Sequence, residues 1–150
     1  MKRISVLHLL IAVSVALASP LFGQDKPFSE ETAIPEGKAL VYFYMPKGLA
    51  GSASAAWVLT EHGPVAVLSN GFYKPYLADP GALTLWPLFN IPQAIPAKFL
   101  LPVTIDLVAG NTYYIKVSQP SASPGKGCFQ KIPTEKAKTS SEILPCSKLE

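Results

Sequence analysis

The sequence predicts an all-β domain, a sandwich or barrel of seven or eight short antiparallel strands. Three observations support this prediction. Short runs of β-branched and aromatic residues recur along the chain, which is typical of strands. Turn sequences such as Asn70-Gly71 and Asp79-Pro80-Gly81 separate these runs. The chain spreads 10 Gly and 15 Pro over its length while 49% of its residues are hydrophobic, so we expect an ordered, turn-rich domain rather than disorder.

The N-terminus predicts export. Lys2 and Arg3 precede an uncharged run over residues 4–18, the pattern of a secretory signal peptide. A membrane span needs about 20 apolar residues, so a retained anchor is the less favoured alternative. Small residues at the end of the run suit signal peptidase and place the mature start near Ser19, with a cut after Gly23 as the alternative.

The mature chain is predicted to be a soluble, near-neutral single domain. No cysteine lies near the cleavage site to carry a lipid, so we expect no stable membrane anchor after cleavage. Removal of Lys2 and Arg3 leaves eleven basic and ten acidic residues, which argues against a nucleic-acid partner. About 130 residues suffice for one core. We expect residues 1–18 as signal peptide, 19–35 as a flexible polar lead and 36–150 as the domain.

The strands follow from local pattern. Residues 38–45 are apolar on both faces and predict a central strand. Residues 65–86 read as a meander whose Asn70-Gly71 favours a tight hairpin turn. Residues 103–107 and 112–118 alternate strictly and predict the best-defined hairpin, with Val103, Ile105 and Leu107 inward. The eight predicted strands are residues 38–45, 55–60, 65–68, 72–78, 82–86, 103–107, 112–118 and 128–132.

Two further segments complete the expected fold. Pro87 and Pro102 bound a stretch with four prolines, which predicts an excursion or an edge because proline gives a sheet no N–H donor. Near the C-terminus, Thr139 and Glu142 resemble a capping box, and Pro145 limits the predicted helix to a short turn.

Cys128 and Cys146 are the only cysteines. In an oxidising compartment they predict an intramolecular disulfide, worth about 3 kcal/mol in the loop-entropy description. Two separate thiols are the alternative. A metal site is much less favoured, because only His62 remains after cleavage and zinc needs about four ligands.

The sequence indicates no catalytic site and no cofactor. His62 lies in a Gly-Pro turn, where we expect it to be exposed, and no spacing ties it to a serine or an acid. Phosphate loops, nucleophile elbows and zinc motifs are missing from the sequence. A hydrolase or other enzyme whose site is not recognisable from sequence remains the alternative to a non-catalytic module.

Four aromatic residues suggest a binding platform. Tyr42, Tyr44, Trp86 and Tyr114 fall on strand positions that could face outward together, where they would bind a glycan or a peptide. The ordinary alternatives are cross-strand packing and cover by a second sheet.

Five segments, in this order and spacing, cover nearly the whole mature chain. They are residues 35–44 (Pro-Glu-Gly-Lys-Ala-Leu-Val-Tyr-Phe-Tyr), 68–73 (Leu-Ser-Asn-Gly-Phe-Tyr), 79–81 (Asp-Pro-Gly), 108–117 (Val-Ala-Gly-Asn-Thr-Tyr-Tyr-Ile-Lys-Val) and 144–149 (Leu-Pro-Cys-Ser-Lys-Leu). With these segments the chain resembles the bacterial envelope family known as domain of unknown function 2846. The chain departs from that family at Met45, where an arginine commonly precedes the proline, and in lacking the cysteine of its lipoprotein members.

The resemblance implies an exported protein of a Gram-negative bacterium with a transthyretin-like β-sandwich, and it transfers no catalytic residue. We therefore expect a periplasmic or secreted, non-catalytic envelope module that binds a protein, peptide or glycan. Recognition through a sheet edge or through the proline-rich stretch would leave no sequence motif.

Overall fold

The computed structural model describes residues 27–31, 33–48, 55–89, 101–118 and 128–149. The predicted signal peptide and residues 90–100 of the proline-rich stretch lie outside these residues. The strands are β1 (Ala39–Met45), β2 (Ala56–Thr60), β3 (Gly63–Leu68), β4 (Phe72–Ala78), β5 (Gly81–Phe89), β6 (Val103–Leu107), β7 (Thr112–Val117), β8 (Phe129–Ile132) and β9 (Ser147–Lys148), and helix α1 (Thr134–Lys138) lies between β8 and β9.

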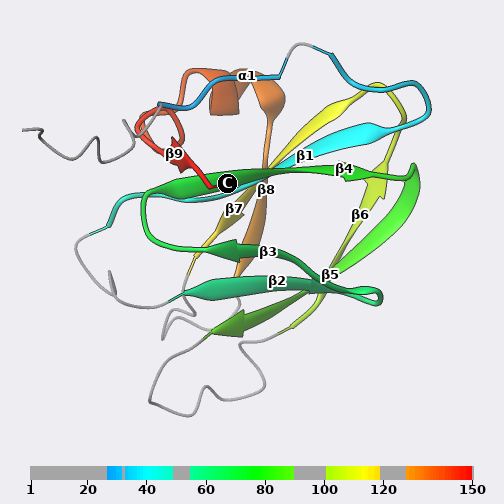
Figure 1. Ribbon diagram of the computed structural model, residues 1–150, viewed down its shortest axis with the longest axis horizontal. Coiled ribbons are helices and arrows are strands. Elements are labelled where there is room, and N and C mark those ends of the chain that lie inside the picture. The colour runs from blue at the N-terminus through cyan, green and yellow to red at the C-terminus, as the bar shows by residue number, and fades with distance from the viewer. Residues whose placement is uncertain (1–26, 32, 49–54, 90–100, 119–127, 150) are drawn as a thin grey trace, which may run out of the picture.

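The strands form two sheets that face each other (Figure 1). The five-stranded sheet has the order β8-β7-β1-β4-β9, and the four-stranded sheet has the order β3-β2-β5-β6. Eight of the described strands contain four or more residues and β9 contains two. The predicted all-β sandwich is confirmed, but the five-stranded sheet is mixed rather than antiparallel, because β1 pairs parallel with β7 and β4 pairs parallel with β9.

Strand β1 occupies the centre of the five-stranded sheet, as predicted. It pairs antiparallel with β4 and parallel with β7, and all seven of its residues are buried. Because successive side chains of a strand point to opposite faces, β1 contributes to two separate hydrophobic clusters. Val41 and Phe43 belong to the cluster between the sheets, and Leu40 and Tyr42 belong to the cluster on the other face.

The inner core fills the space between the two sheets. Both sheets contribute to it, with Phe43 and Ile115 from one and Val58, Leu85 and Ile105 from the other. Ile105 and Leu107 point inward as predicted. Removing this apolar surface from water is the main favourable contribution to folding, at about 25 cal/mol per Å².

The outer core lies on the opposite face of the five-stranded sheet. It consists of Leu40, Tyr42, Tyr44, Tyr73, Tyr114, Ile132, Ala137, Ile143 and Cys146, with Phe28 and Ile34 packed against it. Residues 27–31, α1 and the turn at residues 141–145 cover it, and Figure 1 shows the N-terminal segment crossing above the sheet beside α1. Within the lead predicted for residues 19–35, Phe28 and Ile34 pack against the outer core and help to cover the apolar outer face of β1.

The turns at Asn70-Gly71 and Asp79-Pro80-Gly81 do not form hairpins, so the predicted meander is wrong. Gly71 and Gly81 have positive φ angles of 84° and 118°. However, β3 and β5 belong to the four-stranded sheet while β4, between them, belongs to the five-stranded sheet. The chain thus crosses between the sheets at both turns.

The predicted hairpin of residues 103–107 and 112–118 is wrong for the same reason. Strand β6 pairs with β5, and β7 pairs with β1 and β8. The turn between β6 and β7 is closed by the Tyr113 hydroxyl, which accepts a hydrogen bond of 2.8 Å from the Val108 amide. A hairpin and a crossover between sheets use similar turn residues, so the turn chemistry alone did not distinguish them.

Prolines inside strands occur at positions where a neighbouring strand pairs on one side only. Pro87 lies within β5, not at its end as predicted, and pairs with Val58 of β2. Strand β6 pairs with β5 only up to Leu85. Pro75 of β4 has a similar position, because β9 pairs only with Phe72 and Tyr73. Such positions tolerate the missing N–H donor.

The short C-terminal helix exists but lies earlier than predicted. Helix α1 begins after Pro133 and buries Ala137, and Thr139 is its C-cap rather than an N-cap. The Thr139 hydroxyl donates to the Glu135 carbonyl oxygen at 3.2 Å. Proline suits the start of a helix because that position needs no N–H donor, and this places the helix before the predicted capping box.

Truncation of Leu85 should destabilise the fold strongly. Leu85 is fully buried in the inner core, so Leu85→Ala should lower the free energy of unfolding by about 2–5 kcal/mol. The matched control is Leu77→Ala on β4, an exposed leucine, which should cost less than about 1 kcal/mol. Urea unfolding of both variants measures the difference, and equal losses would contradict the assignment of the inner core.

Candidate functional site

The four residues of the predicted aromatic platform do not form an exposed surface. Tyr42, Tyr44 and Tyr114 are fully buried in the outer core, whereas Trp86 lies on the other sheet and is 36% exposed. The prediction grouped Trp86 with the three tyrosines, whereas β5, which carries Trp86, belongs to the four-stranded sheet. It failed on exposure, because residues 27–31, α1 and the C-terminal turn cover that face.

The buried tyrosines form an aromatic cluster with defined hydrogen bonds. Tyr42 and Tyr114 stack with ring centroids 5.4 Å apart. The Tyr114 hydroxyl donates to Glu30 Oε1 at 2.7 Å, and the Tyr42 hydroxyl accepts from the Glu31 amide at 2.5 Å. Burial raises the pKa of Tyr42 to about 12, and burial together with the bond to Glu30 raises the pKa of Tyr114. Both phenols are neutral at physiological pH.

The predicted disulfide between Cys128 and Cys146 is absent, and the alternative of two separate thiols holds. Cys128 belongs to the inner core and Cys146 to the outer core, so the two lie on opposite faces of the five-stranded sheet. The Cys146 thiol lies 3.2 Å from the Glu142 carbonyl oxygen. A disulfide requires Cα atoms within about 7 Å and side chains that point toward each other, which a sheet between the two residues prevents.

His62 lies in the turn between β2 and β3, and its side chain is 86% exposed. Its Nε2 lies 3.4 Å from Glu61 Oε1. A cavity of about 270 Å³ adjoins it, lined among others by Thr60, Tyr76, Asp79 and Trp86. The Thr60 hydroxyl donates to the Gly63 carbonyl oxygen at 3.1 Å, so it does not donate to the imidazole as a nucleophile would.

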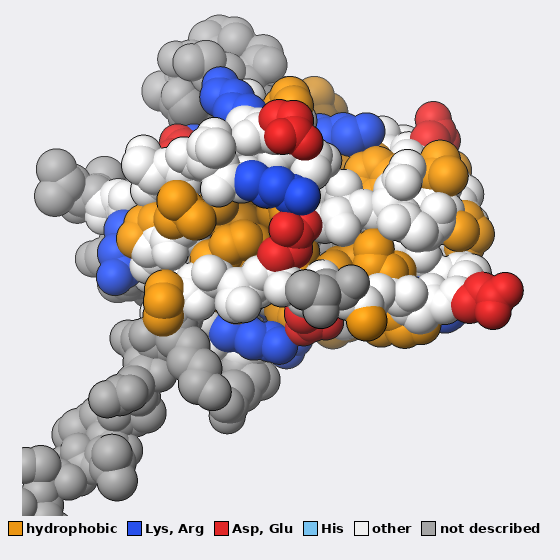
Figure 2. Space-filling model, turned by 90° about the horizontal axis from the view of Figure 1, so that it is seen from above, with side chains coloured by type: hydrophobic (Ala, Val, Ile, Leu, Met, Phe, Trp, Pro, Cys, Tyr) orange, Lys and Arg blue, Asp and Glu red, His pale blue; other side chains and the backbone are white. Residues whose placement is uncertain are grey.

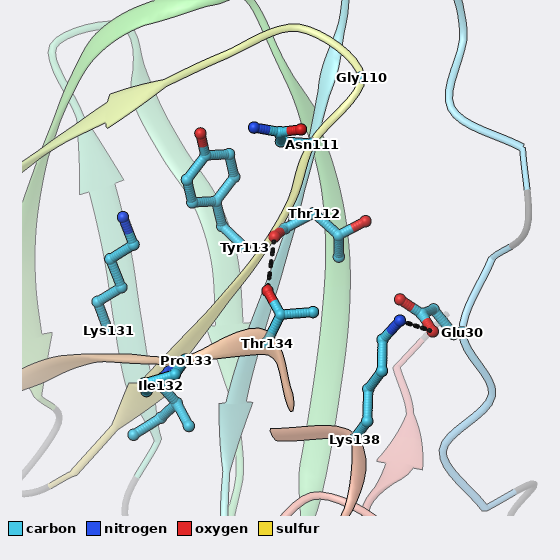
Figure 3. Close-up of a pocket in the computed structure, with 10 residues that line it drawn as sticks. All are labelled: Glu30, Gly110, Asn111, Thr112, Tyr113, Lys131, Ile132, Pro133, Thr134 and Lys138. Atoms are coloured by element: carbon cyan, nitrogen blue, oxygen red, sulfur yellow. Dashed lines mark hydrogen bonds and ion pairs between the residues drawn. The ribbon is translucent and has the colours of Figure 1, made fainter. Parts of the chain in front are cut away.

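A second cavity, of about 590 Å³, lies beside α1 at the end of the five-stranded sheet (Figure 3). Its lining residues are Glu30, Gly110, Asn111, Thr112, Tyr113, Lys131, Ile132, Pro133, Thr134 and Lys138. The charged groups of the lining are engaged locally. Lys138 Nζ lies 3.4 Å from Glu30 Oε2, and Lys131 Nζ lies 4.9 Å from the centre of the Tyr113 ring. The lining contains one carboxylate, so it offers no carboxylate pair for acid–base chemistry.

The outer face of the four-stranded sheet carries the exposed apolar surface that sequence reasoning missed. Trp57, Val67, Trp86 and Leu88 are 38%, 41%, 36% and 48% exposed, and we call these four residues the tryptophan face. Val67, Trp57 and Leu88 lie in one cross-strand row over β3, β2 and β5. Trp86 lies two residues before Leu88 and thus on the same face.

A signal for this face exists in the sequence. Trp57 and Leu59 on one strand, and Trp86 and Leu88 on another, are apolar residues two positions apart. However, the buried neighbours Val58, Leu85 and Pro87 are also apolar, so alternation does not reveal which face points outward. Only the pairing of β2 with β5 joins the two tryptophan-bearing strands.

Two other kinds of feature are absent from the described residues. No helix in the described part of the chain is long and apolar enough to span a membrane. Within the same residues, no three His, Cys, Asp or Glu side chains gather as metal ligands would.

No family model, no curated protein and no solved structure matches this chain. The resemblance to the family of domain of unknown function 2846 therefore stays a prediction.

The Tyr44 hydroxyl should be dispensable for stability, unlike that of Tyr114. Among the described residues, the Tyr44 hydroxyl is a buried polar atom without a hydrogen-bond partner. Because an unsatisfied buried hydroxyl costs about 1–3 kcal/mol, Tyr44→Phe should leave the free energy of unfolding unchanged or raise it. Tyr114→Phe removes the donor to Glu30 and should lower it by about 1–3 kcal/mol. Urea unfolding tests this, and a larger loss for Tyr44→Phe would contradict the packing described.

Both thiols should be unreactive in the folded protein and titrate only at high pH. Burial raises the pKa of Cys128 and of Cys146 from 9.0 to about 11. At pH 7, Ellman's reagent should label neither thiol in the native protein and two thiols per chain in urea; no labelling in urea would indicate a disulfide.

The raised pKa values of the two thiols make the free energy of unfolding depend on pH. Because the folded pKa of each thiol lies above the unfolded one, this contribution to stability is present below about pH 9 and is lost as the pH rises toward 11. Urea midpoints measured from pH 8 to 11 should therefore decrease, and less steeply in a variant with both cysteines changed to alanine.

Proposed function

We propose that this protein is an exported, non-catalytic binding module of the bacterial envelope, and that it binds a partner protein through the tryptophan face. The observation that carries the proposal is the contiguous exposure of Trp57, Val67, Trp86 and Leu88 on three paired strands. Soluble monomers rarely expose large contiguous apolar patches, and such patches mark interaction sites.

The composition of this face favours a protein partner over a glycan. Tryptophan is enriched at the energetic centres of protein interfaces because it brings a large rigid apolar surface. Glycan sites also use aromatic rings, but they need polar groups beside them to bind hydroxyls. Val67 and Leu88, which flank Trp57 in the same cross-strand row, offer no such groups.

The alternative, a hydrolase with an unrecognised site, receives less support from the geometry. Among the described residues, His62 is the only histidine. Its imidazole is exposed and lies beside Glu61. A catalytic base needs an oriented nucleophile within about 3.2 Å, while the nearby Thr60 hydroxyl is bonded to the backbone of Gly63.

The test combines partner capture with tryptophan fluorescence, because the chain contains two tryptophans and both lie on this face. In the capture step, the mature wild-type domain, the double variant Trp57→Ala/Trp86→Ala and the control Leu77→Ala are each used to bind partners from envelope extracts. We expect one partner protein to be retained by the wild type and the control and to be lost from the double variant. The purified partner should shift the tryptophan emission of the wild type to shorter wavelength.

Two outcomes would contradict the proposal. The first is a captured partner that the double variant retains. The second is binding of soluble glycans, rather than protein, with the same shift in emission. Urea unfolding must show that the double variant is folded, and because both side chains are partly exposed we expect a loss of no more than about 1–2 kcal/mol in unfolding free energy.

A further inference from the structure

We propose that the outer core is a peptide-binding groove, that residues 27–31 of the chain occupy it in cis, and that it accepts in exchange an extended segment of a partner protein. The partner segment would carry an aromatic residue followed by acidic residues. We call residues 27–31 (Pro-Phe-Ser-Glu-Glu) the strap. This surface lies on the opposite side of the sandwich from the tryptophan face, so the inference is independent of the proposed function.

The strap lies on the domain as an extended peptide does. Its residues alternate between exposed and half-buried, with Phe28 and Glu30 turned toward the sheet. This period of two is that of an extended chain. The strap makes one isolated bridge to the sheet, between Pro27 and Ser147 of β9, and is otherwise held by side chains of the domain.

Phe28 is the anchor of the strap. Its ring meets the rings of Tyr42, Tyr73 and Tyr114 edge-on, with centroids 5.1, 4.9 and 6.2 Å away. Edge-to-face pairs of this kind stabilise a contact beyond the burial of apolar area alone. The three tyrosines come from β1, β4 and β7, so the paired strands of the sheet build the aromatic box.

Tyrosine hydroxyls of the box also hold the backbone of the strap. The Ser29 amide donates to the Tyr73 hydroxyl at 3.4 Å, and the Glu31 amide donates to the Tyr42 hydroxyl at 2.5 Å. Contacts to amides recognise any extended chain, whatever its side chains. The selectivity of the groove therefore resides in the aromatic anchor and in the charges beside it.

The charges of the groove are complementary to an acidic segment. Lys138 Nζ lies 3.4 Å from Glu30 Oε2, and Lys148 Nζ lies 2.9 Å from Glu31 Oε1. Figure 2 views the molecule from this side and shows lysine and acidic side chains close together over apolar surface. Exposed ion pairs contribute little binding energy because water screens them, so these lysines discriminate between segments by charge more than they add to the affinity.

The strap competes with a partner because it is tethered. Seven residues connect Glu31 to the first residue of β1, and a short tether gives an effective concentration on the order of millimolar. A partner segment therefore binds weakly while the strap is seated, and more tightly when the anchor of the strap is removed. The strap thus sets a threshold for partner binding.

The test uses a fluorescein-labelled peptide with the sequence of residues 25–32 (Asp-Lys-Pro-Phe-Ser-Glu-Glu-Thr) and the full mature chain. Fluorescence polarisation should show that Phe28→Ala binds the peptide at least about tenfold more tightly than the wild type does, because its strap has lost the anchor. Glu31→Lys, which breaks the ion pair with Lys148, is a milder second variant. Its affinity for the peptide should lie between those of the wild type and Phe28→Ala.

The groove itself is tested in the Phe28→Ala background. Adding Lys138→Glu and Lys148→Glu should weaken peptide binding about tenfold or more, while Lys136→Glu, an exposed lysine of the same helix, should not. A peptide with both glutamates changed to lysine should bind the Phe28→Ala chain about tenfold more weakly than the parent peptide.

Several results would overturn the inference. The first is equal affinity of the wild type and Phe28→Ala for the peptide, and the second is no binding by either chain at millimolar peptide. The third is an affinity that stays the same when the lysines of the groove or the glutamates of the peptide are changed. A concentration-dependent wild-type dimer that Phe28→Ala abolishes would assign the strap to a second copy of the chain instead of a partner. Circular dichroism confirms that each variant is folded before it is scored.

Discussion

The structure depends on β1, a strand that is apolar on both faces. A half-buried strand needs one partner layer, whereas β1 presents Val41 and Phe43 to one side and Tyr42 and Tyr44 to the other. The five-stranded sheet must therefore be covered twice. The four-stranded sheet covers one face, and the strap, α1 and the C-terminal turn cover the other. In the described part of the chain, the outer face of the four-stranded sheet carries the exposed residues of the tryptophan face.

The position of a residue relative to β1 determines its chemistry. Cys128 and Cys146 are separated by the sheet that contains β1, so each is a buried, neutral thiol in its own cluster. The tyrosines of the outer core are buried under the strap, which turns an aromatic surface into a packed box with raised pKa values. The same aromatic residues on an uncovered sheet would form an open platform.

The two surfaces proposed for binding differ in their chemistry. The tryptophan face is open and apolar, and it suits a large flat partner surface. The box under Phe28 is bordered by Lys138 and Lys148, and the inference assigns it to one extended segment. The two proposals together assign this domain two partners, and the residues for either use are ordinary strand residues and a polar lead.

The sequence by itself determined the fold class, the central place of β1, most strand positions and the turn glycines, because these follow from local period and from backbone conformation. Tertiary structure alone decided which strands pair. Gly71 has a positive φ that suits a tight turn, yet the Asn70-Gly71 turn connects two sheets, since pairing depends on which apolar faces can be buried together. Tertiary structure also decided which residues are exposed. Trp57 and Tyr42 are both aromatic strand residues, but a layer covers Tyr42, so Tyr42 is a core residue and Trp57 is a surface residue.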